Sequence, residues 1–531
     1  MSDAPLILGV SGLRGIVGES LTPEVAVRYA AAFGNFINDR IPVPDRRIRL
    51  GRAGACCVVV ARDGREGGES IYHAAISGLL AVGCDVLPIG VATTPTAGIV
   101  AQQLAHAAMV VTASHNPALW NGLKSLIVYE DLANTDEDLA NTDLVLVPSR
   151  MARAPGVADA SAIIDRFERG PVYEPVQEEE CDPPKDPSTL GVCVGPYERA
   201  AVEHVHHVYG ASCTLNTESH GDFEAADERE FFCVVDSVNA SGSTIALTEL
   251  YYFGRAAPLF CDGTGRFPHT PEPTRENLSG PGGLCDAVPG LKADIGFAQD
   301  PDADRLAIID EKGRYIGEEY TLAIAAESVL TGRIWSESLG KRVLVCNLST
   351  SRMIEDVAAR HNAEVVRTPV GEANVVERMI ELRRQGRAVY LGGEGNGGVI
   401  WPQVTYVRDS LSAMALTLSL MARTGKTVSE LVAQIDSYSE GGRGYAIVKR
   451  KAEIKAREDA APAVAAVAEA YAKESVDLQD GVRVDFSGPR AGCWVHVRAS
   501  NTEPIMRLIC EAPTEALAGE ILAEVEKHIA G

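Results

Sequence analysis

The sequence predicts an α/β protein of several domains, and three observations support this. The chain has 531 residues, too many for one hydrophobic core. Short apolar runs alternate with segments of helical spacing, a pattern typical of parallel sheets with crossover helices. Beyond about residue 440, alternating strands joined by short turns stand between two helical segments, which is typical of an antiparallel α+β domain.

Composition changes mark the expected domain boundaries. A stretch rich in Pro, Glu and Asp around 170–188 is typical of a linker, and the polar, acidic stretch 213–230 is expected to be an exposed insertion. A duplicated acidic heptapeptide between Glu130 and Asp143 predicts a surface loop or helix edge. We expect an α/β domain over 1–169, a linker or insertion leading into the second domain over 170–230, α/β domains over 231–312 and 313–425, and an α+β domain over 440–531.

In the first domain, apolar runs and helical spacing alternate regularly. Thr94 is the expected helix cap, with Pro95 in the first turn. The expected elements are a strand over 57–61, a helix over 69–82, a strand over 84–87, a helix over 95–104 and a strand over 109–111.

The later domains repeat this alternation before the pattern changes. The second has an expected strand at 231–236, a helix at 244–253, and strands at 294–298 and 306–309. The third has helices near 318–330, from 351, at 373–384 and at 409–421, with strands at 342–346, near 365 and at 388–391. The last has helical segments at 453–473 and 514–529 and strands at 482–486, 494–497 and 506–510.

Charge and cysteine usage limit the possible partners and the compartment. Acidic residues outnumber basic ones by 73 to 49, for a net charge of −24, which disfavours nucleic acid and anionic membranes as partners. The 12 cysteines include no CxxC pair and lie mostly in apolar runs, as expected for buried thiols in a reducing compartment. With no secretory signal and no apolar run of about 18 residues, we expect a soluble, cytoplasmic protein.

The first candidate site is Thr112-Ala113-Ser114-His115-Asn116-Pro117, which follows the apolar run Met109 to Val111. Open α/β sheets bind ligands at the carboxyl ends of their strands, so Ser114 is the candidate for chemistry. The alternative is a polar turn that contains Ser, His and Asn by coincidence.

The most specific signal is Asp300-Pro301-Asp302-Ala303-Asp304-Arg305, between two apolar strands. In an extended loop, carboxylates at i, i+2 and i+4 share one side and can converge on one ion. A hard divalent cation such as Mg²⁺ prefers such oxygen ligands and would relieve their repulsion. A solvated acidic turn is the alternative.

Three further motifs are suited to phosphate or sugar. Arg498 to Pro504, followed by Arg507, offers many hydrogen-bond donors to an anion, or else is a structural capping turn. Glu394 in a glycine-rich loop could accept hydrogen bonds from sugar hydroxyls, although glycine-rich turns are common. Arg14 lies between glycines and offers a bidentate fork to phosphate, or is a solvated turn residue.

Together these motifs indicate phosphoryl transfer to or from a polyol phosphate. A cation at the aspartates would withdraw charge from the phosphoryl group, and Arg305 could hold its oxygens. A serine phosphatase could use the same nucleophile and metal, but it would not need the distant anion cradle. An inactive sugar-phosphate sensor is the third possibility, although it would not need Ser114 and all three aspartates.

Four of these motifs follow one another along the chain as Thr112 to Pro117, Asp300 to Arg305, Gly393 to Gly397 and Arg498 to Pro504. In this order they resemble the α-D-phosphohexomutase superfamily of phosphoglucomutases, phosphomannomutases and phosphoglucosamine mutases. The resemblance covers nearly the whole chain apart from the insertion-like stretches. It implies three related α/β domains around a central cleft, plus a smaller C-terminal domain. It also implies interconversion of hexose 1- and 6-phosphates through a phosphoserine enzyme and a bisphosphorylated sugar, with a sugar bisphosphate as activator.

The resemblance also implies roles for individual residues. Mg²⁺ would be held by phosphorylated Ser114 and by Asp300, Asp302 and Asp304. His115, Arg14 and Lys124 match positions that assist phosphoryl and proton transfer. Arg305, Glu394 and Asn396 would contact the substrate, and the phosphate that does not react would be bound by Arg498, Ser500, Asn501, Thr502 and Arg507.

Two features, the sugar loop and an earlier stretch, depart from the pattern of many members. Asn396 stands at a serine position of the sugar loop and Gly398 at a histidine position. The stretch Val370 to Val375 lacks a basic residue that several members place there. Both departures resemble an archaeal-type branch and leave open whether glucosamine, glucose or mannose phosphate is preferred.

Overall fold

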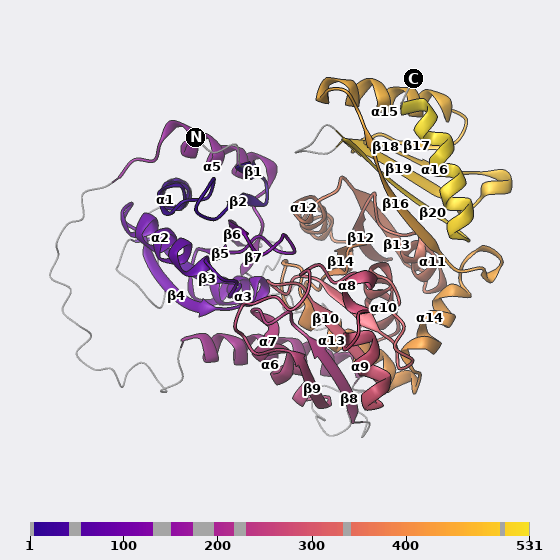
Figure 1. The fold of residues 1–531 in the computed structure, drawn as a ribbon, viewed down its shortest axis with the longest axis horizontal. Helices are drawn as coiled ribbons and strands as arrows, with labels where there is room; N and C mark the ends of the chain where they lie inside the picture. Colours follow the sequence, from indigo (N-terminus) through magenta and orange to yellow (C-terminus); the bar gives the residue numbers. More distant parts are fainter. Residues whose placement is uncertain are drawn as a thin grey trace. The chain divides into compact units, whose positions relative to one another are not determined.

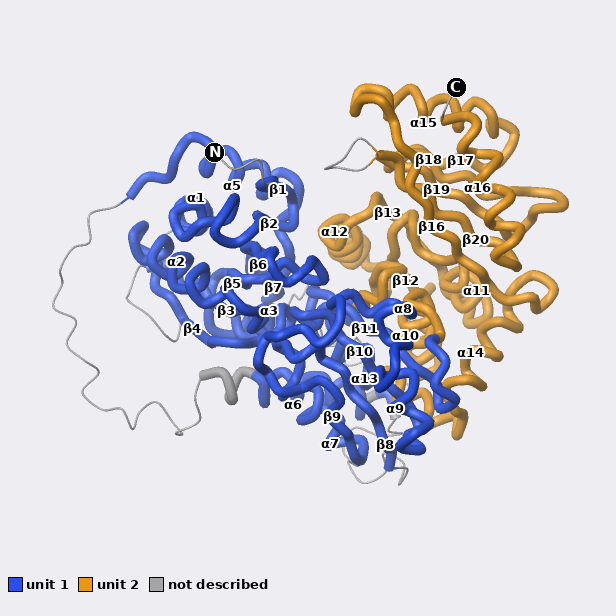
Figure 2. Tube along the Cα trace, viewed as in Figure 1, with its two compact units in different colours: residues 1–315, 400–415 blue, residues 316–399, 416–531 orange. Residues whose placement is uncertain are grey.

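The computed structural model describes residues 5–41, 55–130, 150–173, 196–216, 230–332, 341–499 and 505–529. The chain forms two compact units (Figure 2). Unit 1 comprises Met1–Tyr315 and Ile400–Ala415, and unit 2 comprises Ile316–Val399 and Leu416–Gly531. The duplicated acidic stretch after Glu130 and most of the expected linker lie outside the described residues.

The first sheet of unit 1 is mixed rather than wholly parallel (Figure 1). Strands β3, β4 and β5 are parallel as predicted, but β1, β2, β6 and β7 join antiparallel. The short loop 112–119 turns the chain from β5 directly into β6, too short for a parallel crossover. The strand order is β1 (Ile7–Gly9), β2 (Gly12–Ile16), β6 (Trp120–Glu130), β5 (Ala107–Val111), β3 (Cys57–Arg62) and β4 (Asp85–Val91), with β7 (Arg150–Arg153) against β6.

Helices cover both faces of this sheet, so its central strands are buried on both sides. Alternate residues of β3 belong to two separate cores: Val58 and Val60 lie in the core of α1 and α2, and Val59 lies in that of α3. The expected cap at Thr94 is wrong by one position, because the Thr93 hydroxyl accepts from the Thr96 N–H. The helices are α1 (Pro23–Arg40), α2 (Gly68–Leu80), α3 (Thr94–Leu104) and α5 (Val157–Arg169).

The second sheet of unit 1 carries the aspartate loop between its last two strands. Its order is β11 (Leu306–Ile309), β10 (Ile295–Gln299), β8 (Phe231–Asp236) and β9 (Gly254–Phe260). Strands β8, β9 and β10 are parallel, and β11 returns antiparallel to β10. The helices are α7 (Gly242–Tyr251), α8 (Arg275–Leu278) and α9 (Leu284–Leu291).

Part of the expected linker is a helix, α6 (Pro196–Asn216). It packs against α3 and α7, and it buries Ala201, Val205 and Val208 on one face. Cys213 and Leu215, expected in an exposed insertion, are buried as well. The acidic composition around them hid a helix whose apolar residues recur at helical spacing.

Unit 2 begins with a sheet whose three main strands are parallel, as predicted. Its order is β13 (Glu364–Thr368), β12 (Arg342–Asn347), β14 (Ala388–Glu394) and β15 (Gly398–Ile400). Strand β12 pairs in parallel with both β13 and β14. The helices are α10 (Glu318–Thr331), α11 (Met353–Arg360), α12 (Glu372–Arg384), α14 (Val428–Asp436) and, from Leu416 on, α13 (Ser410–Thr424).

The C-terminal part of unit 2 is the predicted antiparallel α+β fold. Its order is β16 (Ala446–Glu453), β20 (Ile505–Ala512), β19 (Trp494–Ala499), β18 (Val482–Asp485) and β17 (Ser475–Asp477). Helices α15 (Ala460–Ala470) and α16 (Glu515–Ile529) share its apolar core. The helical prediction for 453–473 is too long, because Glu453 pairs with Ile505 as the end of β16 and α15 starts later.

The described cysteines are free thiols, and all but Cys261 and Cys285 are buried. Within the part of the chain that the structure describes, no helix has both the length and the apolar character needed to cross a bilayer.

Candidate active site

Three adjacent strands of the first sheet present Arg14, Lys124 and the Ser114 loop. Strand β6 pairs with β2 on one side and with β5 on the other, so Arg14 lies opposite Gly122 and Lys124 lies opposite Val110. The pairing of β2 with β6 requires glycine at position 12, where φ is +105° and a Cβ atom would lie 2.0 Å from the Leu123 carbonyl oxygen. The order of the strands thus gathers residues that are distant in sequence.

The Ser114 loop is strained and firmly held. Ser114 has φ of +50°, a left-handed conformation that is uncommon outside glycine. Its N–H donates to the Thr112 hydroxyl at 2.9 Å, and that hydroxyl donates to Asp63 Oδ2 at 2.7 Å. The side chain of Ser114 is thereby directed by its own backbone.

Arg65, which the sequence analysis did not identify, supports this loop with its side chain. Its guanidinium is buried, pairs with Asp63 at 2.8 Å and donates to the carbonyl oxygens of Ser114, of Asn116 at 3.3 Å and of Trp120 at 2.7 Å. One cation therefore compensates several buried acceptors. Its only sequence signal is its place after Asp63-Gly64 at the end of β3.

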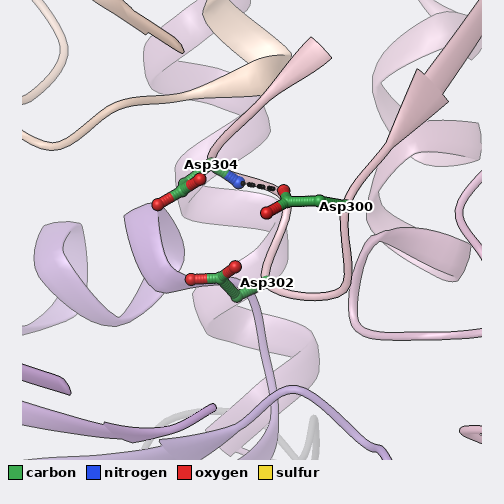
Figure 3. A group of neighbouring side chains, drawn as sticks. All are labelled: Asp300, Asp302 and Asp304. Carbon is green, nitrogen blue, oxygen red and sulfur yellow. Dashed lines mark hydrogen bonds between the residues drawn. The ribbon is translucent and has the colours of Figure 1, made fainter. Parts of the chain in front are cut away.

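The aspartate loop is a tight turn, not the extended loop assumed from spacing (Figure 3). The Ala303 N–H donates to the Asp300 carbonyl at 2.9 Å, and Ala303 has φ of +55°. The N–H groups of Asp304 and Arg305 both donate to Asp300 Oδ1 at 3.1 Å. The turn brings one carboxylate oxygen of each aspartate within 4.8 Å of the others, so the predicted clustering is correct although its geometric reason is not.

Two basic side chains and a hydroxyl bind the Oδ2 atoms of Asp304 and Asp302. Asp304 Oδ2 accepts from Lys124 Nζ at 2.7 Å and from Arg408 at 2.6 Å. Asp302 Oδ2 accepts from the Thr94 hydroxyl at 2.7 Å. Thr94 and Arg408 were missed, because their motifs carry no local signal and each meets its aspartate only through long-range folding.

The remaining oxygens fit a divalent cation. Within the described residues, Asp302 Oδ1 and Asp304 Oδ1 are buried and have no hydrogen-bond partner. Burial, together with the charges of Asp304 and Asp302, raises the pKa of Asp300 well above its usual value. A hard cation bound by oxygen ligands would satisfy both orphaned oxygens and favour ionised Asp300.

Ser114 meets this cluster directly. Its hydroxyl donates to Asp300 Oδ2 at 2.7 Å, and the Oγ atom lies 3.3 Å from His115 Nδ1. The charge of Arg305, followed by burial and the charge of Arg14, lowers the pKa of His115 well below its ordinary value of 6.5. The imidazole is therefore neutral near pH 7 and able to accept a proton.

Arginine side chains border the same site. The Arg14 guanidinium lies 3.5 Å from Asn116 Oδ1. Arg305 Nε lies 3.9 Å from Asp304 Oδ1 and, within the described residues, has no hydrogen-bond partner. Such buried donors are suited to oxygen atoms of a phosphoryl group.

Unit 2 contains the predicted sugar loop. Glu394 is buried, and its Oε1 accepts from Asn347 Nδ2 at 2.8 Å and from the Gly371 N–H at 3.1 Å. Asn396 Oδ1 accepts from the Gly398 N–H at 3.2 Å, which shapes the turn. A Cβ atom at position 395 would lie 2.0 Å from a carboxylate oxygen of Glu319, so a larger residue there would require the Glu319 side chain to move.

The predicted phosphate-binding residues are partly described. Arg498 of β19 and Arg507 of β20 lie directly opposite each other, an unfavourable pairing of like charges unless an anion lies near. Arg498 Nε is buried with no hydrogen-bond partner in the described residues, and its Nη1 lies 3.9 Å from Asp480. Ser500, Asn501 and Thr502 lie outside the described residues.

Comparison with known proteins identifies related chains. Models of the phosphoglucomutase/phosphomannomutase α/β/α domains I, II and III match residues 5–129, 212–313 and 318–438, and the model of the C-terminal domain matches 448–528. A phosphoglucomutase/phosphomannomutase of Thermococcus kodakarensis is 33% identical and covers 97% of this chain and 96% of its own.

Further relatives extend this similarity. A phosphoglucosamine/phosphogalactosamine mutase of Sulfurisphaera tokodaii is 27% identical, with 99% of each chain covered. The fold is also that of a crystal structure of a phosphoglucomutase/phosphomannomutase family protein from Burkholderia thailandensis, with a TM-score of 0.68, 21% identity and 98% of each chain covered.

Proposed function

Because the chain belongs to the phosphoglucomutase/phosphomannomutase family, we propose that it is a phosphohexomutase that interconverts hexose 1-phosphates and 6-phosphates. The observation that carries this proposal is the bond from the Ser114 hydroxyl to Asp300 at 2.7 Å, inside a buried cluster of three carboxylates. A nucleophile in that position is suited to carrying a phosphoryl group.

The reaction transfers one phosphoryl group in each direction. The hydroxyl of a hexose monophosphate attacks the phosphorus of phosphorylated Ser114, the bond from phosphorus to Oγ breaks, the proton of the attacking hydroxyl passes to a base, and Oγ takes up a proton. The product is a hexose bisphosphate. After the sugar reorients, the Ser114 hydroxyl loses its proton to a base and attacks the other phosphate; the bond from that phosphorus to the sugar oxygen breaks and the sugar oxygen takes up a proton, which regenerates phosphoserine and releases the isomeric monophosphate.

The acidic turn fits a divalent cation, since two of its buried carboxylate oxygens have no hydrogen-bond partner among the described residues. Asp300, Asp302 and Asp304 would hold Mg²⁺ together with an oxygen of the Ser114 phosphate. When bound, the ion would withdraw charge from the phosphoryl group.

The residues around the turn have separate tasks. Arg14 and Arg305 would bind the equatorial oxygens of the phosphoryl group in flight, where negative charge is spread. His115, neutral near pH 7 and 3.3 Å from Oγ, is placed to receive a proton. Lys124 holds Asp304 at 2.7 Å and adds positive charge beside the reacting group.

Glu394 and the arginine pair of unit 2 are the proposed substrate-binding residues. Glu394 would accept hydrogen bonds from sugar hydroxyls, next to the turn in which Asn396 Oδ1 accepts from the Gly398 N–H. Arg498 and Arg507 would bind the phosphate that does not react. The names of the relatives refer to glucose, mannose, glucosamine and galactosamine phosphates, which supports a hexose or hexosamine phosphate as the proposed substrate.

Assays with purified protein, Mg²⁺ and a trace of glucose 1,6-bisphosphate test this proposal. Glucose, mannose and glucosamine 1-phosphates are supplied separately at equal concentration. A mutase forms the 6-phosphate of at least one sugar. Release of inorganic phosphate would instead indicate a phosphatase, and binding without any conversion would indicate a sensor; either result contradicts the proposal.

A further inference from the structure

Helix α6 is a feature that the family models leave largely uncovered. The domain I match ends at residue 129 and the domain II match begins at 212, so most of this helix lies between them. Yet α6 packs against α3 of the first sheet layer and against α7 of the second. It therefore joins two parts of unit 1 that each carry residues of the candidate active site.

His204 is the one histidine of the described part of α6 that is fully buried, and both of its ring nitrogens have partners. Nδ1 lies 2.9 Å from the Thr96 hydroxyl, and Nε2 lies 3.1 Å from Asp409 Oδ2. An ionised carboxylate only accepts, so Nε2 donates a hydrogen bond to Asp409. The Thr96 hydroxyl that bonds Nδ1 also lies 2.6 Å from the Thr93 hydroxyl.

One partner of His204, Thr96, lies at the start of α3, the helix whose first turn contacts Asp302. Thr96 lies in the first turn of α3. Two residues earlier, Thr94 donates its N–H to the Asp302 carbonyl oxygen at 3.0 Å and its hydroxyl to Asp302 Oδ2 at 2.7 Å. The first turn of α3 thus fixes both the backbone and the carboxylate of Asp302.

The other partner, Asp409, lies at the start of α13, next to the residue that contacts Asp304. Asp409 precedes α13 and accepts from the N–H groups of Leu411 at 3.0 Å and of Ser412 at 3.1 Å, as a helix N-cap does. Its chain neighbour Arg408 donates to Asp304 Oδ2 at 2.6 Å. The neighbour on the other side, Ser410, donates its hydroxyl to the Ala303 carbonyl oxygen at 2.7 Å.

We propose that His204 is a positioning residue for the acidic turn: by joining Thr96 to Asp409, it holds the two helix starts that orient Asp302 and Asp304. The described side chains of α6 make no hydrogen bond or ion pair with these carboxylates. The helix acts through Thr94 and Arg408, as outer-shell partners of a metal site do. The proposal rests on the cation site of the proposed function, but not on the identity of the sugar.

Substitution by phenylalanine tests this, because the ring is kept and both nitrogens are lost. His207, one turn further along α6, supplies the matched control: it also bonds to α3, through Gln103 at 2.7 Å, but has no link to the acidic turn. The readout is the dissociation constant for Mn²⁺, measured by calorimetry on the full-length protein without substrate.

We expect His204→Phe to weaken Mn²⁺ binding by about tenfold, the lower end of the effect of losing an outer-shell partner, because His204 acts through Thr94 and Arg408. His207→Phe should stay within about twofold of the wild type, because its bond to Gln103 holds neither helix start. A folded His204→Phe variant with wild-type affinity would overturn the proposal, and so would wild-type protein that binds no Mn²⁺. Wild-type protein that binds Mn²⁺ but isomerises no sugar would refute only the proposed function.

Thr96→Val is the second variant, in case His204→Phe does not fold. It removes one hydroxyl from the same chain of hydrogen bonds and leaves the shape of the side chain nearly unchanged. Weaker Mn²⁺ binding with an unchanged melting temperature supports the proposal. Unchanged Mn²⁺ binding in this variant contradicts it.

Discussion

Replacing Arg65 by methionine would leave several buried acceptors without a donor. The guanidinium is 1% exposed, pairs with Asp63 at 2.8 Å and binds three carbonyl oxygens of the loop that carries Ser114. Removing one partner of a buried ion pair costs about 3 to 5 kcal/mol. We therefore expect Arg65→Met to destabilise unit 1 by that amount, and to lower turnover because the Ser114 backbone loses its support.

Urea unfolding followed by circular dichroism measures this effect. With an m-value of about 3 kcal/mol/M, the lowest transition should shift down by about 1 to 2 M. The matched control is Arg266→Met, because Arg266 also pairs with an acid at 2.7 Å, Glu66, but in solvent. We expect no measurable shift in the control. If the Arg65 variant shifted no further than the control, the buried support assigned to Arg65 would be refuted.

Three other substitutions test separate parts of the site. Asp302→Asn should weaken Mg²⁺ activation by more than about tenfold, since even outer-shell changes reach that size; an unchanged Mg²⁺ titration would contradict the metal site. Asp480→Asn should raise KM about twofold to fivefold with kcat near the wild type, because Arg498 loses a partly exposed ion pair; equal KM values would count against that role. Burial lowers the pKa of His496 from its ordinary 6.5 to about 4, so the folded state favours the neutral ring. The free energy of unfolding should therefore fall as pH drops from 6.5 to about 4. The loss should approach about 3 kcal/mol and be absent in His496→Gln; identical urea midpoints across this range would refute it.

The sequence indicated the Ser114 and aspartate motifs, but it did not indicate the residues that hold these two loops in place. Ser114 and the three aspartates are found because a polar cluster directly follows an apolar strand, which is a local signal. Arg65 and Arg408 carry no such signal. Arg408 meets Asp304 across 104 positions of sequence, and only the order of strands and helices brings them together.

The fold shows the same division between local and long-range information. Strand–helix alternation predicted most elements of the three α/β sheets. It did not reveal that β2 and β6 pair antiparallel with their neighbours, because strand direction depends on how the chain returns. Acidic composition hid α6, whose buried face includes a histidine that composition alone places in solvent.

The central claim is that Ser114 carries the phosphoryl group, and one measurement tests it directly. Protein is incubated with glucose 1,6-bisphosphate and Mg²⁺, and one half then receives excess hexose monophosphate. Both halves are digested, and the mass of the peptide containing Ser114 is measured by mass spectrometry. The account predicts one phosphoryl group on Ser114 that is lost to the added sugar, and none in Ser114→Ala. A fully active enzyme whose Ser114 is never phosphorylated would contradict it.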